Sequence, residues 1–160
     1  MAKSSAPAPW WIRMTSPVHF ALAFLLAWLA QALFALPVLT GSLRGASHVA
    51  GTVLANAGWI LALWCIVLFR QRRTTVMPGG QPSDIVLRGP YRYSRNPMYL
   101  GLLAGYIGLA LILDVPWALL TMLPALWLLA RAIIPFEEAR LLAQFGQACV
   151  EYQRRVPRWL

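Results

Sequence analysis

Four long apolar runs constrain the fold of this chain more than any other feature of its sequence. They cover residues 18–39, 49–69, 97–113 and 115–135, and polar or charged residues separate them. A helix needs about 20 mainly apolar residues to cross the hydrocarbon core of a bilayer. With 59% hydrophobic and 12% charged residues, the chain also differs from soluble domains, of which about a quarter is charged. The sequence therefore predicts an all-α integral membrane protein with four transmembrane helices, forming one membrane domain over residues 1–160.

The polar segments between the runs predict how these helices are connected. The first run is longer than the apolar core of a signal peptide, which has about 7 to 15 residues, so we expect it to be a retained span. Residues 40–48 are expected to form a short outer loop, and residues 74–94 a long inner loop between spans two and three. After span four, Phe136, Leu141, Leu142 and Phe145 fall close to helical spacing, which predicts a C-terminal amphipathic helix along the membrane surface.

The distribution of charge predicts the orientation of the chain. Of 14 Lys and Arg residues, only Arg44 lies in the expected outer loop. Because cytoplasmic segments of membrane proteins are enriched in Lys and Arg, we expect both termini and the long loop to be cytosolic. The net charge of +9 then reflects topology and attraction to anionic lipid, and no nucleic acid partner is needed to explain it. We expect a multi-pass protein of a bacterial inner membrane.

Cysteine and histidine are too few and too scattered to form a metal centre. Cys65 lies within an apolar run and Cys149 in a cytosolic segment, while His19 and His48 stand alone near predicted helix ends. Zinc sites need clusters of such side chains. The sequence therefore predicts no metal.

A polar loop meets the third apolar run at Asn96 and Pro97. The stretch at residues 89–101 reads Gly-Pro-Tyr-Arg-Tyr-Ser-Arg-Asn-Pro-Met-Tyr-Leu-Gly. Proline suits the first position of a helix, and a helix N-terminus beside Arg92 and Arg95 is suited to bind a carboxylate or phosphate. The alternative is that the arginines only set topology and the tyrosines only form an interfacial belt.

Two adjacent acids follow the fourth run. If Glu137 and Glu138 face Arg92 and Arg95 across the bundle, they form a site with both signs of charge, as an amino-acid-like ligand requires. The alternative is a solvated start to the surface helix, where acids are favoured. Arg131, near the inner end of span four, either snorkels to the headgroups or has a function.

Several ordered blocks give the chain a family resemblance. They are Thr-Thr-Val-Met-Pro at residues 74–78, the stretch at 89–101, the Glu pair with the following Phe-Gly, Tyr152, and Val-Pro-Arg at 156–158. Together they resemble the isoprenylcysteine carboxyl methyltransferase family and its phospholipid N-methyltransferase relatives, which are integral membrane enzymes that use S-adenosylmethionine. The resemblance covers residues 74–160, which it marks as the cofactor-binding part.

The resemblance implies roles for individual residues. Arg95, Pro97, Tyr99 and Gly101 match the family's Arg-His-Pro-x-Tyr-x-Gly block, and the Glu pair matches its acidic pair. Two departures are Asn96 in place of the block's His and Cys149 in place of the first Tyr of a paired-Tyr segment. The expected catalytic residues are Arg95, Arg131 and Glu138. The expected cofactor-binding residues are Tyr91, Arg95, Asn96, Pro97, Tyr99, Leu100, Gly101, Glu137, Glu138 and Tyr152.

The expected chemistry is methyl transfer from S-adenosylmethionine, with S-adenosylhomocysteine as product. The apolar helices suggest a lipophilic acceptor that enters from the bilayer. A carboxylate acceptor is favoured and needs only orientation, for which Arg131 and Arg95 are the candidates. An amine would need Glu138 as base, and a thiol would need a lowered pKa. The competing class is a non-enzymatic four-helix membrane protein that binds anionic lipid. Oligomeric state is left open.

Overall fold

The part of the chain that the structure describes is helical. The structure is a computed structural model, and it describes residues 16–71 and 86–160. Within these ranges no strand occurs. The block at residues 74–78 lies outside the described residues. The helices are α2 (Ser16–Leu33), α3 (Gly41–Gln71), α4 (Pro97–Ile112), α5 (Trp117–Leu128), α6 (Ile134–Phe145) and α7 (Gln147–Arg155), with a 3-10 helix η1 (Gly89–Arg92) and a π-helical turn η2 (Leu129–Ile133).

The first two helices differ from the predicted spans at their outer ends. Helix α2 ends at Leu33, before the apolar run ends, because Pro37 disfavours a helical conformation in the residue before it. The side-chain amide of Gln31 donates to the carbonyl oxygen of Leu36 at 3.1 Å. Helix α3 begins at Gly41, whose φ of +59° makes the turn. The predicted outer loop at residues 40–48 is therefore wrong, since helix formation does not stop where the apolar run stops.

Spans three and four are connected largely as the pattern indicates, but the inner end of span four differs. Helix α4 begins at Pro97, as predicted. One helical segment runs from Trp117 to Phe145 through Pro135, where the sequence predicted an end. The π-helical turn η2 ends at Ile133, two residues before Pro135, which has no N–H to donate in an ordinary helical hydrogen bond. Gly146, with φ of +52°, then turns the chain into α7, so two helices replace the single amphipathic helix.

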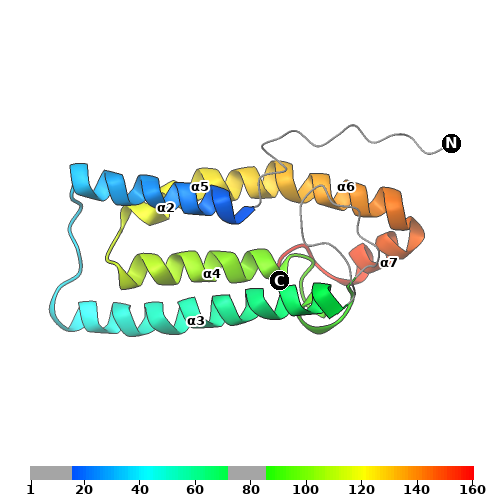
Figure 1. Cartoon of the computed structure of the whole chain (residues 1–160), viewed down its shortest axis with the longest axis horizontal. Helices are drawn as coiled ribbons and strands as arrows, with labels where there is room; N and C mark the ends of the chain where they lie inside the picture. The colour runs from blue at the N-terminus through cyan, green and yellow to red at the C-terminus, as the bar shows by residue number, and fades with distance from the viewer. Residues whose placement is uncertain (1–15, 72–85) are drawn as a thin grey trace.

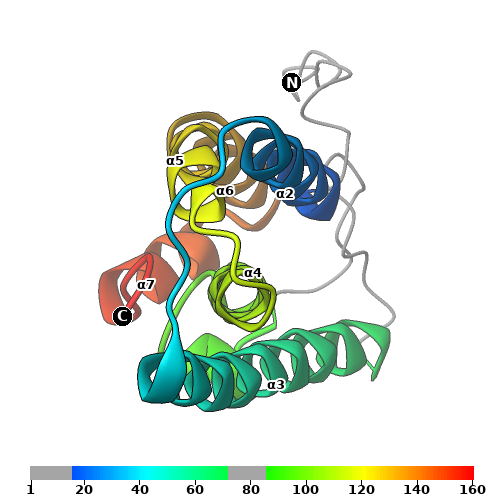
Figure 2. The same cartoon turned by 90° about the vertical axis from the view of Figure 1, so that its left-hand side faces the viewer.

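The helices pack as two pairs. Helix α3 lies along α4, and α2 lies along α5 (Figures 1 and 2). Small residues bring the first pair close, because a Cβ atom on Gly58 would lie 2.5 Å from the carbonyl oxygen of Gly101. The two pairs meet where Phe20 and Phe24 of α2 pack edge-on against Tyr106 of α4, with ring centroids 5.7 and 5.3 Å apart.

The outer surface of the helical body is apolar. Two helical segments are long and apolar enough to cross a membrane, Gly41–Gln71 and Trp117–Phe145, and α2 and α4 are shorter apolar helices. Large side chains point outward from them: Leu26 is 60% exposed, Ile60 65% and Trp127 64%. Soluble proteins rarely expose contiguous apolar surface on this scale. The helical body is therefore suited to contact with lipid.

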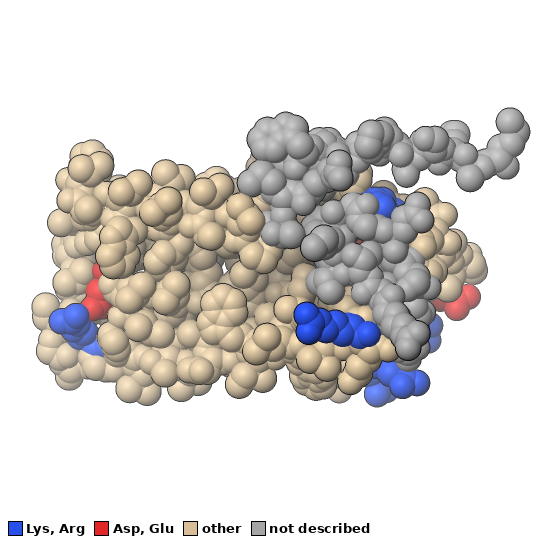
Figure 3. Space-filling model, viewed as in Figure 1, with Lys and Arg blue, Asp and Glu red and all other residues tan. Residues whose placement is uncertain are grey.

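Charged side chains gather toward the two ends of the long axis. Figure 3 shows an uncharged expanse between them on the face that it draws. At one end, Arg44 of α3 forms an ion pair of 2.8 Å with Asp114, in the turn between α4 and α5. At the other end, the start of α4 approaches α6, α7 and the segment at residues 156–160 (Figure 1). We call this second end the Glu138 end.

Candidate active site

The loop that leads into α4 is anchored from two sides. Pro90 is the second residue of η1, and its carbonyl oxygen accepts hydrogen bonds from the backbone N–H groups of Tyr93 and Ser94 at 3.1 and 3.2 Å. The ring of Tyr91 packs edge-on against Phe69 of α3, with centroids 5.5 Å apart. The hydroxyl of Tyr152 on α7 donates to the backbone oxygen of Tyr91 at 2.9 Å. These contacts fix the loop whose last residues are Arg95 and Asn96.

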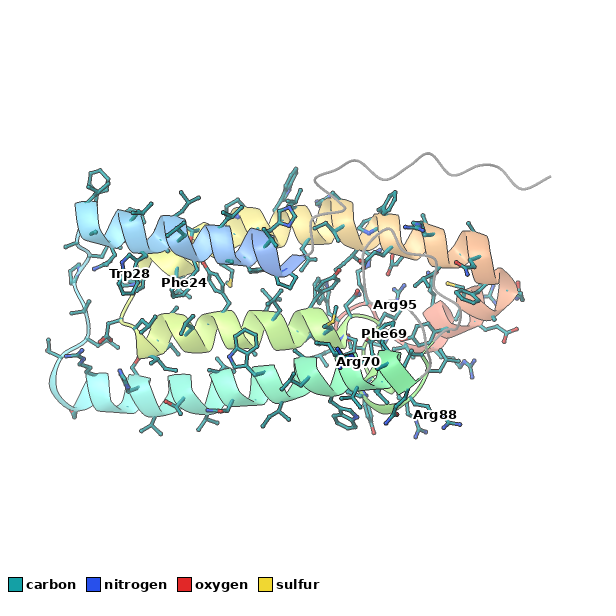
Figure 4. The ribbon with its side chains drawn as sticks, viewed as in Figure 1. Phe24, Trp28, Phe69, Arg70, Arg88 and Arg95 are labelled. Atoms are coloured by element: carbon teal, nitrogen blue, oxygen red, sulfur yellow. The ribbon has the colours of Figure 1, made fainter. Side chains whose placement is uncertain are left out.

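Glu138 of α6 lies between two arginines. Arg95 Nη1 is 2.7 Å from Glu138 Oε1, Arg158 Nη2 is 2.5 Å from Oε2, and Arg158 Nε is 3.2 Å from Oε1. The side chains of Arg95 and Glu138 are each 17% exposed, whereas that of Arg158 is 40% exposed. Figure 4 shows Arg95 beyond the start of α4, on the side of α6 and α7. Glu138 and Arg95, two of the predicted site residues, therefore form an ion pair. The pair is partly desolvated, which strengthens it.

The neighbouring acid is held separately. The hydroxyl of Tyr99, in the first turn of α4, donates to Glu137 Oε1 at 2.9 Å. Tyr99 is buried in the main apolar core. Two successive carboxylates on α6 are thus bound by residues that α4 and its preceding loop provide, and the two elements form one polar site.

Asn96 does not cap α4 with its side chain. Its amide Nδ2 donates instead to the backbone oxygen of Arg158 at 2.9 Å, and the hydroxyl of Ser94 donates to the same oxygen at 3.3 Å. The backbone N–H of Arg95 donates to the carbonyl oxygen of Pro157 at 2.9 Å. Asn96, which replaces the His of the family block, therefore binds the segment that carries Arg158.

Arg158 is the site residue for which the sequence analysis predicted no role. It appeared there only as the end of the Val-Pro-Arg block, which gave no sign that it would contact Glu138. The sequence placed Arg92 beside the acids instead, and the structure corrects this: Arg92 is exposed at the end of η1, and no ion pair joins it to the acids at the Glu138 end.

The other predicted site residues lie around this cluster in different ways. Pro97 is buried at the start of α4 and Leu100 is half-buried. Gly101 is buried against the backbone of α3, so its position serves helix packing. Arg131 is exposed on η2, and no ion pair connects it to Glu137 or Glu138.

Burial keeps several polar groups of the site neutral. It raises the pKa of Tyr152 to about 12, although the charge of Arg95 opposes the shift. Burial also raises the pKa of Tyr91 and that of the Cys149 thiol. The hydrogen bond to Glu138 raises the pKa of Arg158. Near neutral pH the two hydroxyls and the thiol are therefore protonated hydrogen-bonding groups, and the guanidinium carries its charge.

One buried donor of the site has no partner within the described residues. The Nε atom of Arg95 is buried and makes no hydrogen bond, although its Nη1 atom binds Glu138. Leaving such a donor unpaired costs free energy, so the site is suited to a ligand with an anionic group. The carboxylates of Glu137 and Glu138 are suited to a cationic group on the same ligand. This donor and acceptor set fits a ligand that carries both an anionic and a cationic group, as an amino acid does.

The apolar body and the charged cluster at one end define an integral membrane protein with a polar site at the ends of its helices. Comparison with known families agrees with this. Residues 46–148 match the phospholipid methyltransferase family, and the chain belongs to that family.

Two curated relatives are protein-S-isoprenylcysteine O-methyltransferases. The protein of that name with the suffix B from Arabidopsis thaliana is 34% identical over 73 residues, which cover 46% of this chain and 37% of the relative. The protein from Tribolium castaneum is 31% identical over 115 residues, which cover 64% of this chain and 40% of the relative. The chain thus spans about two fifths of the length of these relatives. No solved structure matches the chain. The family resemblance inferred from the sequence is confirmed.

Proposed function

We propose that this protein is a membrane-embedded methyltransferase that uses S-adenosylmethionine and modifies a lipophilic acceptor. The observation that carries the proposal is the Arg95–Glu138 ion pair of 2.7 Å at the start of α4. It joins opposite charges from two blocks that the family resemblance associates with the cofactor. Family membership and the names of the relatives support the same activity.

The residues that would hold the cofactor are those of the charged cluster and the loop around it. Arg95 offers its unpaired Nε to a carboxylate, and Glu138 with Glu137 offers acceptors to an ammonium group. The remaining contacts are proposed for Tyr91, Asn96, Pro97, Tyr99, Leu100, Gly101 and Tyr152. When bound, S-adenosylmethionine supplies a methyl group already activated by its sulfonium, and S-adenosylhomocysteine remains as product. The chain's residues therefore mainly align the partners and exclude water.

The favoured acceptor is a carboxylate. It is ionised at neutral pH and needs orientation by a cation, for which Arg95 and Arg131 are the candidates. Arg131 is exposed on η2, within the helical segment Trp117–Phe145 that is apolar enough to cross a membrane, so it is accessible to an acceptor carried in lipid. The O-methyltransferase names of the relatives favour this acceptor. The family's phospholipid name favours an amine acceptor as the alternative, with Glu138 as the base, and a thiol acceptor is a third possibility.

The proposed topology has four spans, both termini in the cytosol and the Glu138 end at the cytosolic face of a bacterial inner membrane. The described charges support it. Arg44 pairs with Asp114 at one end of the helices and Arg158 with Glu138 at the other. Arg70, Arg88 and Arg95 also lie toward the Glu138 end (Figure 4). Cytoplasmic segments carry such an excess of arginine. The charged cofactor then enters from the cytosol and the acceptor from the bilayer.

Isothermal titration calorimetry with S-adenosylhomocysteine tests the cofactor proposal. The protein purified in detergent should bind S-adenosylhomocysteine with an affinity of about micromolar or better. This product lacks only the methyl group of the cofactor, so it should keep most of the cofactor's contacts. Arg95→Ala and Glu138→Ala should each abolish measurable binding. Arg44→Ala, an arginine at the opposite end that is 60% exposed, is the matched control and should bind like the wild type. If folded wild-type protein does not bind S-adenosylhomocysteine, the cofactor proposal is refuted.

The chemistry of the acceptor is tested by the stability of the transferred label. Protein supplied with methyl-labelled S-adenosylmethionine and a total lipid extract should yield a lipid-soluble labelled product. Mild base releases the label from a methyl ester and leaves an N-methyl group intact. A base-stable label would refute the carboxylate assignment and favour the amine.

A further inference from the structure

We propose that Arg158 is a positioning residue of this site, and that the segment at residues 156–159 forms its fixed outer wall. The inference rests on the proposed function, because it assigns to Arg158 the orientation of an acid that binds the cofactor. No residue of this segment belonged to the predicted site.

The backbone of the segment is bound to the loop that carries Arg95. Two of its carbonyl oxygens accept hydrogen bonds: that of Pro157 from the backbone N–H of Arg95 and that of Arg158 from Asn96 Nδ2, each at 2.9 Å. The next residue, Trp159, packs against the main apolar core. Arg158 therefore approaches Glu138 from a fixed backbone and not from a free tail.

The guanidinium of Arg158 determines how Glu138 is oriented. Its Nη2 and Nε atoms contact Oε2 and Oε1 of the carboxylate at 2.5 and 3.2 Å, a fork geometry that holds both oxygens. Arg95 then contacts only Oε1, through Nη1, and its Nε stays unpaired. Without Arg158, the freed carboxylate is able to turn and pair with both Nη1 and Nε of Arg95. That rearrangement would occupy the donor that the ligand needs.

A second possibility predicts the opposite effect. If Arg158 only occupied the place of a ligand's ammonium group, its removal would free Glu138 and strengthen cofactor binding. The two backbone hydrogen bonds of the segment and the packing of Trp159 favour the positioning role. If Arg158 had to move away when the ligand binds, these three attachments would oppose that movement.

Calorimetry with S-adenosylhomocysteine on Arg158 variants tests the inference. Arg158→Ala should bind about tenfold more weakly than the wild type, since a charge-assisted hydrogen bond that orients the acid is lost. Arg158→Lys keeps the charge without the fork and should recover part of the loss. Arg154→Ala, an exposed arginine on the adjacent α7, is the control and should leave the affinity unchanged. Equal melting temperatures of all variants would show that the loss is not one of folding.

Ser94→Ala gives an independent readout, because Ser94 is not among the proposed cofactor contacts. It removes the hydroxyl that donates to the carbonyl oxygen of Arg158 at 3.3 Å and should loosen the segment, so it should weaken binding in the same direction as Arg158→Ala and by less. The double variant should bind no more weakly than Arg158→Ala alone, because both changes remove one arrangement. Additive losses would overturn the positioning role.

The outcomes separate this inference from the function on which it rests. If the wild type binds S-adenosylhomocysteine and Arg158→Ala binds it equally or more tightly, the inference is wrong and the proposed function stands. If the folded wild type does not bind it, the proposed function itself fails.

Discussion

Replacing Gly58 by alanine tests whether the α3–α4 contact sets the position of the site. A Cβ atom there would lie 2.5 Å from both the carbonyl oxygen of Gly101 and the backbone nitrogen of Gly105. Ordinary contacts begin at 3.4 Å. Since both neighbours are backbone atoms of a helix and have no side chain to rotate away, the two helices must separate by about 0.9 Å.

Two opposing effects determine the size of the change. Overpacking of this kind costs about 1 to 3 kcal/mol, while alanine is more favourable than glycine in a helix by about 1 kcal/mol. We expect a net destabilisation of up to about 2 kcal/mol, which lowers the melting temperature by up to about 8 °C in a chain of this size. Because α4 carries Tyr99 and follows Arg95 directly, its displacement should also weaken S-adenosylhomocysteine binding.

Thermal unfolding in detergent, followed by tryptophan fluorescence, measures the effect against two controls. Gly45→Ala introduces a Cβ atom with nothing within 4 Å and should melt at or slightly above the wild-type temperature. Gly105→Ala meets only the ring of Trp59, at 3.3 Å, and should fall between the other two. If Gly58→Ala melts at or above Gly45→Ala, the close α3–α4 packing is refuted.

Two further predictions concern tyrosines of the site. Tyr99→Phe removes the donor that binds Glu137 at 2.9 Å, so S-adenosylhomocysteine titration should show weaker binding by about tenfold, and an unchanged affinity would contradict a role for this pair. Burial raises the pKa of Tyr152 from 10.0 to about 12. The folded protein therefore holds the hydroxyl proton more tightly than the unfolded chain does. The stability that this hydroxyl contributes is complete below pH 10 and is lost as the pH rises toward 12. Melting temperatures should fall over that interval, and less steeply in Tyr152→Phe; identical slopes would contradict the assignment.

The parts of the fold that were predictable from the sequence depend on local pattern. The apolar runs predicted helices because lipid-facing surfaces need continuous apolar sequence, and Pro97 marked the start of α4 because proline suits that position. Helix ends that do not coincide with a change in polarity were missed. Helix α3 extends back to Gly41 through polar residues, and Pro135 lies inside a continuous helical segment because the π-helical turn η2 precedes it.

The site was only partly predictable because its pairing depends on contacts between distant segments. The sequence predicted that the acids meet arginines, but it did not identify which arginines. Arg92 and Arg95 are three residues apart; the 3-10 helix η1 ends at Arg92 and leaves it exposed, while Arg95 is turned toward α6. Arg158 reaches Glu138 because Asn96, 62 positions away, binds its carbonyl oxygen. Such a bond has no signature in local sequence.

Methyl transfer by the purified protein tests the central claim most directly. Wild-type protein in vesicles of total lipid extract, supplied with methyl-labelled S-adenosylmethionine, should move label into the organic phase, while Glu138→Ala, which removes the acid between the two arginines, should move none. If folded wild-type protein that binds S-adenosylhomocysteine leaves all of the label in the donor, the claim that this chain is a methyltransferase acting on a lipophilic acceptor is contradicted.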